Sequence, residues 1–189
     1  MALGTPTASP TPIAGDAAQA AFHDLHGPAL YGFALVVAFG DQALAARLAG
    51  RALEDGAHRA DELAHPERAA AWLRHRVTSA VPRRSRRGGP TPAERRALLT
   101  TLGVEPVLAE ALAELTPAQR AAVVASGSEW LARTDAAEAA ATSPSGVRAA
   151  RRRFLAAYQA AADLRGQQPV PGPLARRIQD AAVAVIGKR

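Results

Sequence analysis

Hydrophobic residues recur along this chain at steps of three and four, which is the spacing that places side chains on one face of an α-helix. No segment shows the alternation of apolar and polar positions, rich in β-branched and aromatic residues, that is typical of strands. The pattern therefore predicts an all-α protein. Two helices joined near residues 39–41 are expected to form a first bundle, with a stripe made of Phe22, Leu25, Leu30, Phe33, Val37, Leu44 and Leu48.

A third helix of this bundle is expected to begin at Pro66, because proline has no N–H to lose at the first helical position. Trp72 is expected to anchor the core on the apolar side of this helix, beside Leu73 and Val77. The stretch that follows, AVPRRSRRGGPTP, combines Pro and Gly with four arginines and has no apolar periodicity. It predicts a flexible, basic linker between two helical domains, and its arginines fit a solvated spacer and a phosphate contact equally well.

The second half of the chain contains four helix-start signals. The sequences TPAE from Thr91 and TPAQ from Thr116 each fit a capping box, with a threonine cap, proline next, and Glu or Gln at the third helical position. Thr134 is expected to cap a short helix over AAEAAA, and Ser143 is expected to cap a longer one over GVRAARRRFLAAYQAA. A turn of two or three residues around Ala141 separates these last two helices, which is the layout of a helix-turn-helix.

The longer of these two helices has an apolar face and a basic face. The predicted apolar face consists of Val147, Ala150, Phe154 and Tyr158. The opposite face carries Arg148, Arg151 and Arg152, with Ser145 at its exposed start. This basic face is either a solvated helix surface or a surface for DNA. DNA contact is favoured, because arginines in the first half of a helix gain nothing from the helix macrodipole.

The net charge of +6 also favours an anionic partner, of which nucleic acid is the commonest. Arg148 and Arg152, one helical turn apart, are the candidates for contact with base edges in the major groove. Arg151 and Arg153 are the candidates for contact with phosphates.

Several other classes of function are disfavoured by the residues. The chain has no cysteine, which removes disulfides, thiolate zinc sites and cysteine nucleophiles. The histidines match no metal-site spacing, and the sequence has no nucleophile elbow, phosphate loop or paired catalytic carboxylates, so neither an enzyme nor a cofactor or metal is expected. The apolar run at residues 29–39 is shorter than the roughly 20 residues of a membrane span, and residues 1–15 lack signal-peptide features, so we expect a cytoplasmic protein without membrane contact.

Two segments of the second half, LAELTPAQRAAVV and TDAAEAAATSPSGVRAARRRFL, resemble region 4 of sigma-70 family RNA polymerase sigma factors, in particular the extracytoplasmic-function (ECF) group. Three segments of the first half resemble region 2 of the same group, namely FHDLHGPALYGFAL, GDQALAARLAGRAL and HPERAAAWLRHRV. The two resemblances occur in the order of the family, with a linker between them. They imply a two-domain helical protein that binds core RNA polymerase through region 2 and recognises promoter DNA through both domains.

The resemblance also implies domain boundaries and site residues. The expected parts are a disordered tail at 1–15, a region 2-like domain at 16–80, a linker with a short helix at 81–104, a region 4-like domain at 105–162 and a C-terminal helical extension at 163–189. The implied DNA-binding residues are Ser143, Ser145, Arg148, Arg151, Arg152 and Arg153. The implied polymerase-binding residues are Asp41, Arg47, Leu48 and Arg51. DNA and core RNA polymerase are the expected partners, and an anti-sigma or other regulatory protein is a further candidate.

The chain departs from the family pattern in the second helix of region 2. The acidic and glutamine-containing pattern that contacts the polymerase clamp is replaced here by the sequence RLAGR at 47–51, which reverses the charge of that contact. The aromatic positions used in promoter opening correspond to Leu53 and Ala57, which cannot supply base stacking worth about 1–3 kcal/mol per base. Two hypotheses follow: a divergent ECF-like sigma factor that directs initiation, and a sigma-derived DNA-binding regulator or protein-interaction module that does not.

Overall fold

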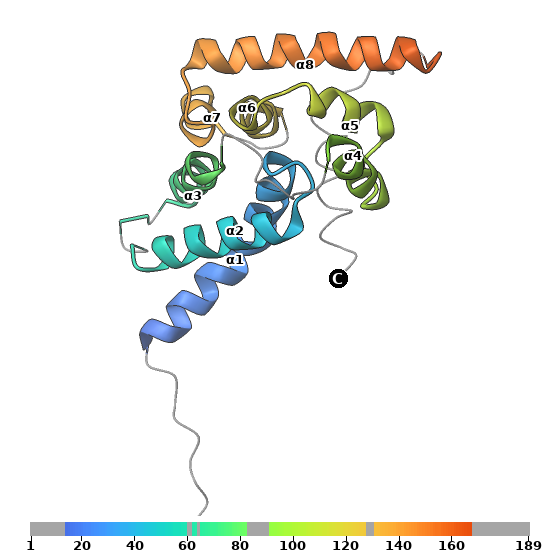
Figure 1. The fold of residues 1–189 in the computed structure, drawn as a ribbon. Coiled ribbons are helices and arrows are strands. Elements are labelled where there is room, and N and C mark those ends of the chain that lie inside the picture. Colours follow the sequence, from blue (N-terminus) through green and yellow to red (C-terminus); the bar gives the residue numbers. More distant parts are fainter. Residues whose placement is uncertain (1–13, 60–61, 64, 83–90, 128–130, 168–189) are drawn as a thin grey trace, which may run out of the picture.

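The computed structural model describes residues 14–59, 62–63, 65–82, 91–127 and 131–167. In this part of the chain all regular structure is helical, which confirms the all-α prediction (Figure 1). The helices are α1 (Ala14–Val37), α2 (Gln42–Ala57), α3 (Pro66–Ala80), α4 (Pro92–Thr101), α5 (Pro106–Ala113), α6 (Pro117–Gly127), α7 (Arg133–Ala139) and α8 (Pro144–Leu164). None of these described helices has both the length and the apolar character that a bilayer crossing requires.

Helices α1, α2 and α3 pack against one another as the predicted first bundle. The chain leaves α1 through two left-handed residues, Phe39 (φ 53°) and Gly40 (φ 80°). A Cβ on Gly40 would lie 3.2 Å from the carbonyl oxygen of Arg95, so glycine permits both the turn and the approach of α4. Asp41 then caps α2, because its Oδ1 accepts a hydrogen bond of 2.9 Å from the Leu44 amide.

Two expectations about this bundle were wrong. Leu25, which was assigned to the same helical stripe as Phe22, is 66% exposed, while Phe22 is buried. Trp72 is not a core anchor, since its indole is only partly buried at the edge of the core. One part of the ring packs against the core, and the guanidinium carbons of Arg59 and Arg76 lie 5.9 and 5.7 Å from its centroid, so charged side chains form part of its environment.

The helix starts in the second half agree with three of the four predictions. Both capping boxes form, at Thr91 with Glu94 and at Thr116 with Gln119. Ser143 caps α8 by accepting a hydrogen bond from the Gly146 amide at 3.1 Å. The prediction for Thr134 was wrong, since α7 begins at Arg133 with Ala132 at its N-cap and no side-chain cap. The amide of Ala136 already bonds the carbonyl of Ala132 at 2.9 Å, which places Thr134 inside the first turn.

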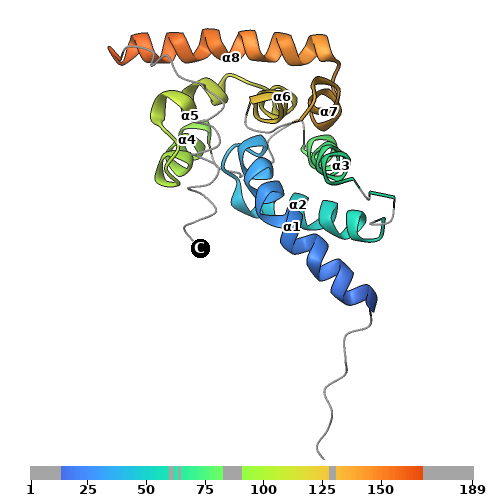
Figure 2. The same ribbon diagram turned by 180° about the vertical axis from the view of Figure 1, so that it is seen from behind.

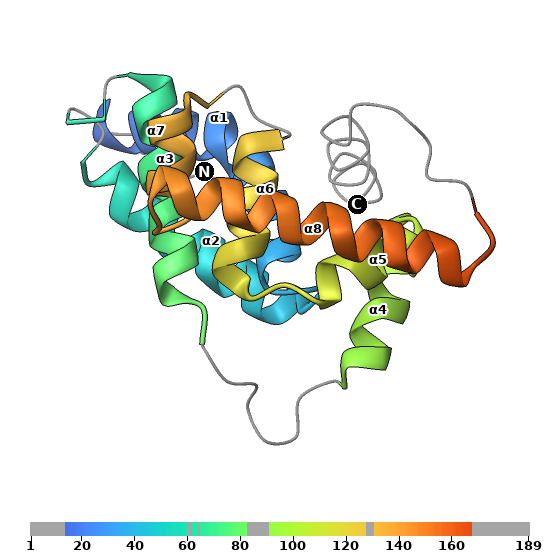
Figure 3. The ribbon, with the colours of Figure 1, turned by 90° about the horizontal axis from the view of Figure 1, so that it is seen from above.

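Helix α8 lies across α5, α6 and α7 (Figure 3). The two halves of the chain also pack together, because α3 contacts α7 and α1 contacts α6. A single cluster of buried side chains runs from Phe33 of α1 to Phe154 of α8. The predicted domain boundaries stay a prediction. Residues 1–13 of the expected tail, 83–90 of the expected linker and 168–189 of the expected extension lie outside the described residues, and α1 begins at Ala14, within the expected tail.

Candidate DNA-binding helix-turn-helix

The connection between α7 and α8 is a tight turn with defined hydrogen bonds. Ala141 adopts the left-handed conformation (φ 50°), and its amide donates to the carbonyl of Glu138 at 2.9 Å. The amide of Thr142 donates to the carbonyl of Ala137 at 3.0 Å. These two bonds make a Schellman motif, which ends α7 and turns the chain toward α8. The turn lies where the sequence predicted it.

The first turn of α8 is fixed by small polar residues. Besides capping the helix, Ser143 places its Oγ 2.8 Å from the Oγ of Ser145. A Cβ on Gly146 would lie 2.2 Å from the Thr142 Oγ1, so only glycine lets the turn pack this closely on the helix. Ser145 is thereby held at the exposed start of α8, where its own backbone N–H and the helix dipole favour anions.

The apolar face of α8 is buried as predicted, with Val147, Ala150, Phe154 and Tyr158 all at most 7% exposed. Phe154 is in the single buried cluster that joins both halves of the chain, and its ring centroid lies 6.3 Å from that of Tyr158. Because this face is fixed against α5, α6 and α7, the opposite face must point to solvent. The packing therefore sets the rotation of α8 about its own axis.

The outward side of α8 carries a basic surface, here called the arginine face and made of Ser145, Arg148, Arg151, Arg152 and Leu155, all exposed. Within the described residues, the side chains of its three arginines make no hydrogen bond or ion pair with the protein. The first carboxylate along α8 is Asp163, beyond the end of this surface. The arginine face is thus a row of unneutralised positive charge beside a helix N-terminus, which suits a polyanion.

Arg153 differs from the other arginines of α8. It is exposed, but its Nε donates a hydrogen bond of 3.3 Å to the carbonyl of Glu114, the residue that ends α5. A guanidinium at a helix C-terminus satisfies an orphan carbonyl and complements the dipole. The structure therefore gives Arg153 an intramolecular contact that the sequence pattern did not indicate.

Sequence reasoning missed Leu155, which is 53% exposed. It lies three residues after Arg152 and seven after Arg148, so helical spacing places it on the same face. The available signal was a leucine placed three, four and seven residues after Arg152, Arg151 and Arg148. Apolar side chains of this kind contact the thymine methyl group in the major groove.

Sequence reasoning also missed how α3 holds the end of α7. The Thr78 Oγ1 donates a hydrogen bond of 2.8 Å to the carbonyl of Ala139, and His75 Nδ1 lies 2.9 Å from the carbonyl of Glu138. Since a carbonyl only accepts, Nδ1 carries the proton, and the Ser79 hydroxyl, 3.3 Å from Nε2, donates to that nitrogen. These contacts join residues that are 61 and 63 positions apart, so no local pattern in the sequence indicates them.

The residues expected to contact polymerase do not form one surface. Leu48 is 7% exposed and belongs to the core, and the Asp41 carboxylate is engaged as the cap of α2. Arg47 and Arg51 are both exposed and one turn apart on α2, and a Cβ on Gly50 between them would meet no atom within 4 Å. Seen from both sides, α2 and α8 lie at opposite ends of the molecule, with α6 and α7 between them (Figures 1 and 2).

No cluster of three or more His, Asp or Glu side chains suited to a metal ion occurs among the described residues. The chain matches no protein-family model, no curated protein and no solved structure. The likeness to sigma factors therefore depends on the residues and spacings of this sequence alone.

Proposed function

We propose that this protein is a divergent ECF-like sigma factor that binds promoter DNA through α8 and directs RNA polymerase to promoters. The observation that supports the proposal is the arginine face, carried by the second helix of a helix-turn-helix whose rotation is fixed by packing. A helix of this kind fits the major groove of B-form DNA.

The roles of the side chains follow from their positions. Arg148 and Arg152 donate in fork geometry to the O6 and N7 acceptors of guanine, which is worth about 1–3 kcal/mol of discrimination per contact. Leu155 contacts a thymine methyl group. Arg151 neutralises phosphate, as Arg153 does after giving up its bond to Glu114. The hydroxyl and the amide of Ser145 bind a phosphate at the N-terminus of α8.

A second candidate function is DNA binding without initiation, as a sigma-derived regulator. The observation that favours it is the exposed pair Arg47 and Arg51, which gives α2 a positive surface where the sigma-factor pattern has acidic residues. Like charges across a protein interface oppose association, so this surface would repel a basic partner site that accepts an acidic helix.

One experiment separates the two functions. The protein is mixed with core RNA polymerase, and complex formation is measured by gel filtration while transcription is measured from genomic templates. A stable complex with specific initiation supports the sigma factor, and retention of DNA without a polymerase complex supports the regulator. Failure to bind DNA at low salt, with or without polymerase, contradicts both. The double variant Arg47→Glu with Arg51→Glu is the matched control, because it restores acidic charge to α2 without touching α8.

A further inference from the structure

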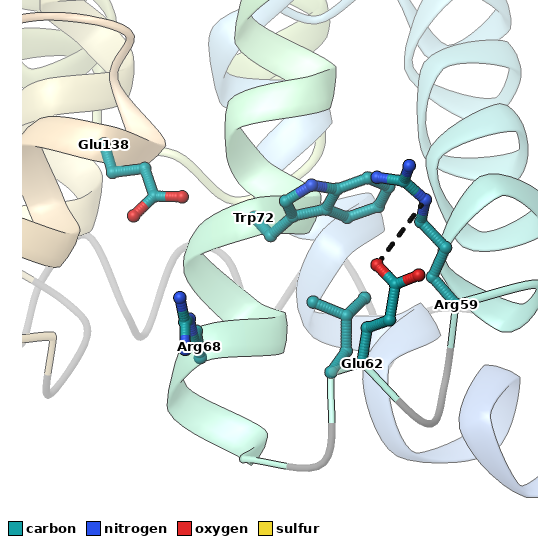
Figure 4. A pocket seen from close by; sticks show the side chains of 6 residues that line it. Arg59, Glu62, Arg68, Trp72 and Glu138 are labelled. Carbon is teal, nitrogen blue, oxygen red and sulfur yellow. Dashed lines mark ion pairs between the residues drawn. The ribbon is translucent and has the colours of Figure 1, made fainter.

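The half-buried indole of Trp72 separates two hollows in the surface. The first has a volume of about 300 Å³ and is lined by Arg59, Glu62, Leu63, Arg68, Trp72 and Glu138 (Figure 4). The second has a volume of about 400 Å³ and is lined by Asp55, His58, Arg59, Trp72 and Arg76. The Trp72 ring lines both hollows, with the guanidinium carbons of Arg59 and Arg76 at 5.9 and 5.7 Å from its centroid, and a planar anionic ligand can stack on it where a guanidinium moves aside.

Two charged groups of the first hollow are unpaired. Within the described residues neither the Arg68 guanidinium nor the Glu138 carboxylate has an ion-pair partner. The Arg59–Glu62 pair is long, at 3.9 Å, and both of its side chains are more than half exposed. Arg59, on a long exposed side chain, can turn from the indole toward a phosphate while a base covers the ring, and Arg76 is held by the Asp55 carboxylate.

The Glu138 carboxylate decides which base fits. An ionised carboxylate is acceptor-only and needs two neighbouring donors on one edge of the base. Guanine offers N1–H and the N2 amino group side by side, whereas adenine and cytosine place a ring acceptor beside their single amino group. Thymine and uracil offer one N–H between two carbonyls. Guanine alone therefore satisfies a carboxylate without repulsion.

We propose that this hollow binds a guanine nucleotide, with the base stacked on Trp72 and its Watson–Crick edge on the Glu138 carboxylate. Arg68 and Arg59 bind the phosphate. The site lies between the two halves of the chain, since Trp72 and Arg68 belong to α3 and Glu138 to α7. A bound nucleotide thus adds to the Thr78 and His75 contacts that join these helices. The proposal does not depend on DNA binding by α8.

Fluorescence of Trp72 tests the proposal directly. The chain has two tryptophans, so the variant Trp130→Phe leaves Trp72 as the only one. In this variant GDP is expected to quench the emission saturably, whereas ADP binds at least about tenfold more weakly and inorganic phosphate does not quench. A single-stranded oligothymidine with one central guanine is tested beside GDP. Quenching by GDP identifies a free nucleotide as the ligand, and quenching by the oligonucleotide alone identifies a guanine within a strand.

Variants in the same background identify the contacts. Glu138→Gln, which places an amide donor against guanine, is expected to abolish the preference for GDP over ADP, and Arg68→Ala is expected to weaken GDP about tenfold or more. Glu114→Gln, an exposed glutamate outside the hollow, is the control and should bind as the parent does. Circular dichroism and the thermal midpoint verify that each variant is folded. Equal quenching by GDP and ADP, an unchanged preference in Glu138→Gln, or no quenching by either guanine probe overturns the proposal.

Discussion

The guanidinium of Arg120 donates two hydrogen bonds to the backbone carbonyl of Val37, at 3.2 Å from Nε and 3.0 Å from Nη2, across 83 residues of sequence. Its Nη1 bonds the carbonyls of Leu112 and Leu115. One side chain of α6 thus satisfies carbonyls at the ends of both α1 and α5. Burial, with a smaller contribution from the charge of Arg95, lowers the pKa of Arg120 to about 10, so the group remains charged at neutral pH.

Replacement of Arg120 is expected to destabilise the fold strongly. In Arg120→Met the buried carbonyls lose their donors, which we expect to cost about 2–4 kcal/mol despite the relief of burying a charge. Arg120→Lys keeps the charge but loses the fork geometry, and it should cost at least as much. Urea unfolding followed by circular dichroism measures both, with exposed Arg133→Met as the control. A loss below about 1 kcal/mol in Arg120→Met would contradict this role.

The arginine face predicts a specific effect on DNA binding. Arg148→Ala with Arg152→Ala should weaken binding by about 1–3 kcal/mol per lost base contact and relax the sequence preference. Arg151→Ala should weaken binding to all sequences alike. It should also reduce the slope of the logarithm of the binding constant against the logarithm of salt concentration by about one, because one phosphate contact is lost. Fluorescence anisotropy at several salt concentrations distinguishes the two kinds of contact. Unchanged affinity, or affinity that does not respond to salt, would exclude DNA recognition by this face.

The left-handed residue between α7 and α8 predicts a stabilising substitution. An alanine in this conformation is strained by roughly 1–2 kcal/mol, and glycine removes this strain. Glycine also has more conformational freedom in the unfolded chain, which offsets part of the gain in stability. Ala141→Gly is therefore expected to stabilise the protein by about 0.5–1 kcal/mol. Ala149→Gly, at an exposed position inside α8, is the matched control and should destabilise by about 1 kcal/mol. Chemical denaturation measures the change in unfolding free energy for both variants. If both changes had the same sign, the left-handed conformation assigned to Ala141 would be contradicted.

The contact between Thr78 and Ala139 can be tested by an isosteric change. Thr78→Val removes the buried hydroxyl donor while keeping the shape, and the orphaned carbonyl should cost about 1–3 kcal/mol. Thr78→Ser retains the donor and should recover most of that loss. Hydrogen exchange of the α7 amides provides a local measure, since opening of this helix should rise in the valine variant only. Equal protection in both variants would show that the hydroxyl is dispensable.

His26 predicts an acid sensitivity of the first bundle. Burial, and secondly the charge of Arg74, lower the pKa of His26, whose ring lies 4.6 Å from that of Phe22. Because the folded state binds the proton less readily than the unfolded state, stability is lost as pH falls below the unfolded value near 6.5. His26→Gln should reduce the difference in unfolding free energy between about pH 7.5 and pH 5.5. Exposed His23→Gln is the control, and an unchanged difference in His26→Gln would contradict the assignment.

The features that the sequence predicted well are local ones. Capping boxes at Thr91 and Thr116, the cap at Ser143 and the inward face of α8 depend on spacings of three and four residues, which any helix imposes. Trp72 was mispredicted because its environment is set partly by Arg59, in the turn after α2, rather than by its own periodicity. The contacts of Arg120 and Thr78 were missed because their partners are backbone carbonyls of residues distant in the sequence. Every residue carries such a carbonyl, so no sequence pattern distinguishes them.

Helix α7 has seven residues, carries no side-chain cap at its start, and has its last carbonyls held by α3. A helix this short is unstable by itself in water. Its order therefore depends on packing against α6 and α8 and also on α3, a part of the chain more than 50 residues upstream. A transplant of residues 105–162 onto another protein would keep α5, α6 and α7, which orient α8, but would lose the α3 contacts that hold the end of α7. Recombination or truncation at the basic stretch after α3 would likewise separate α7 and α8 from the helix that holds the end of α7.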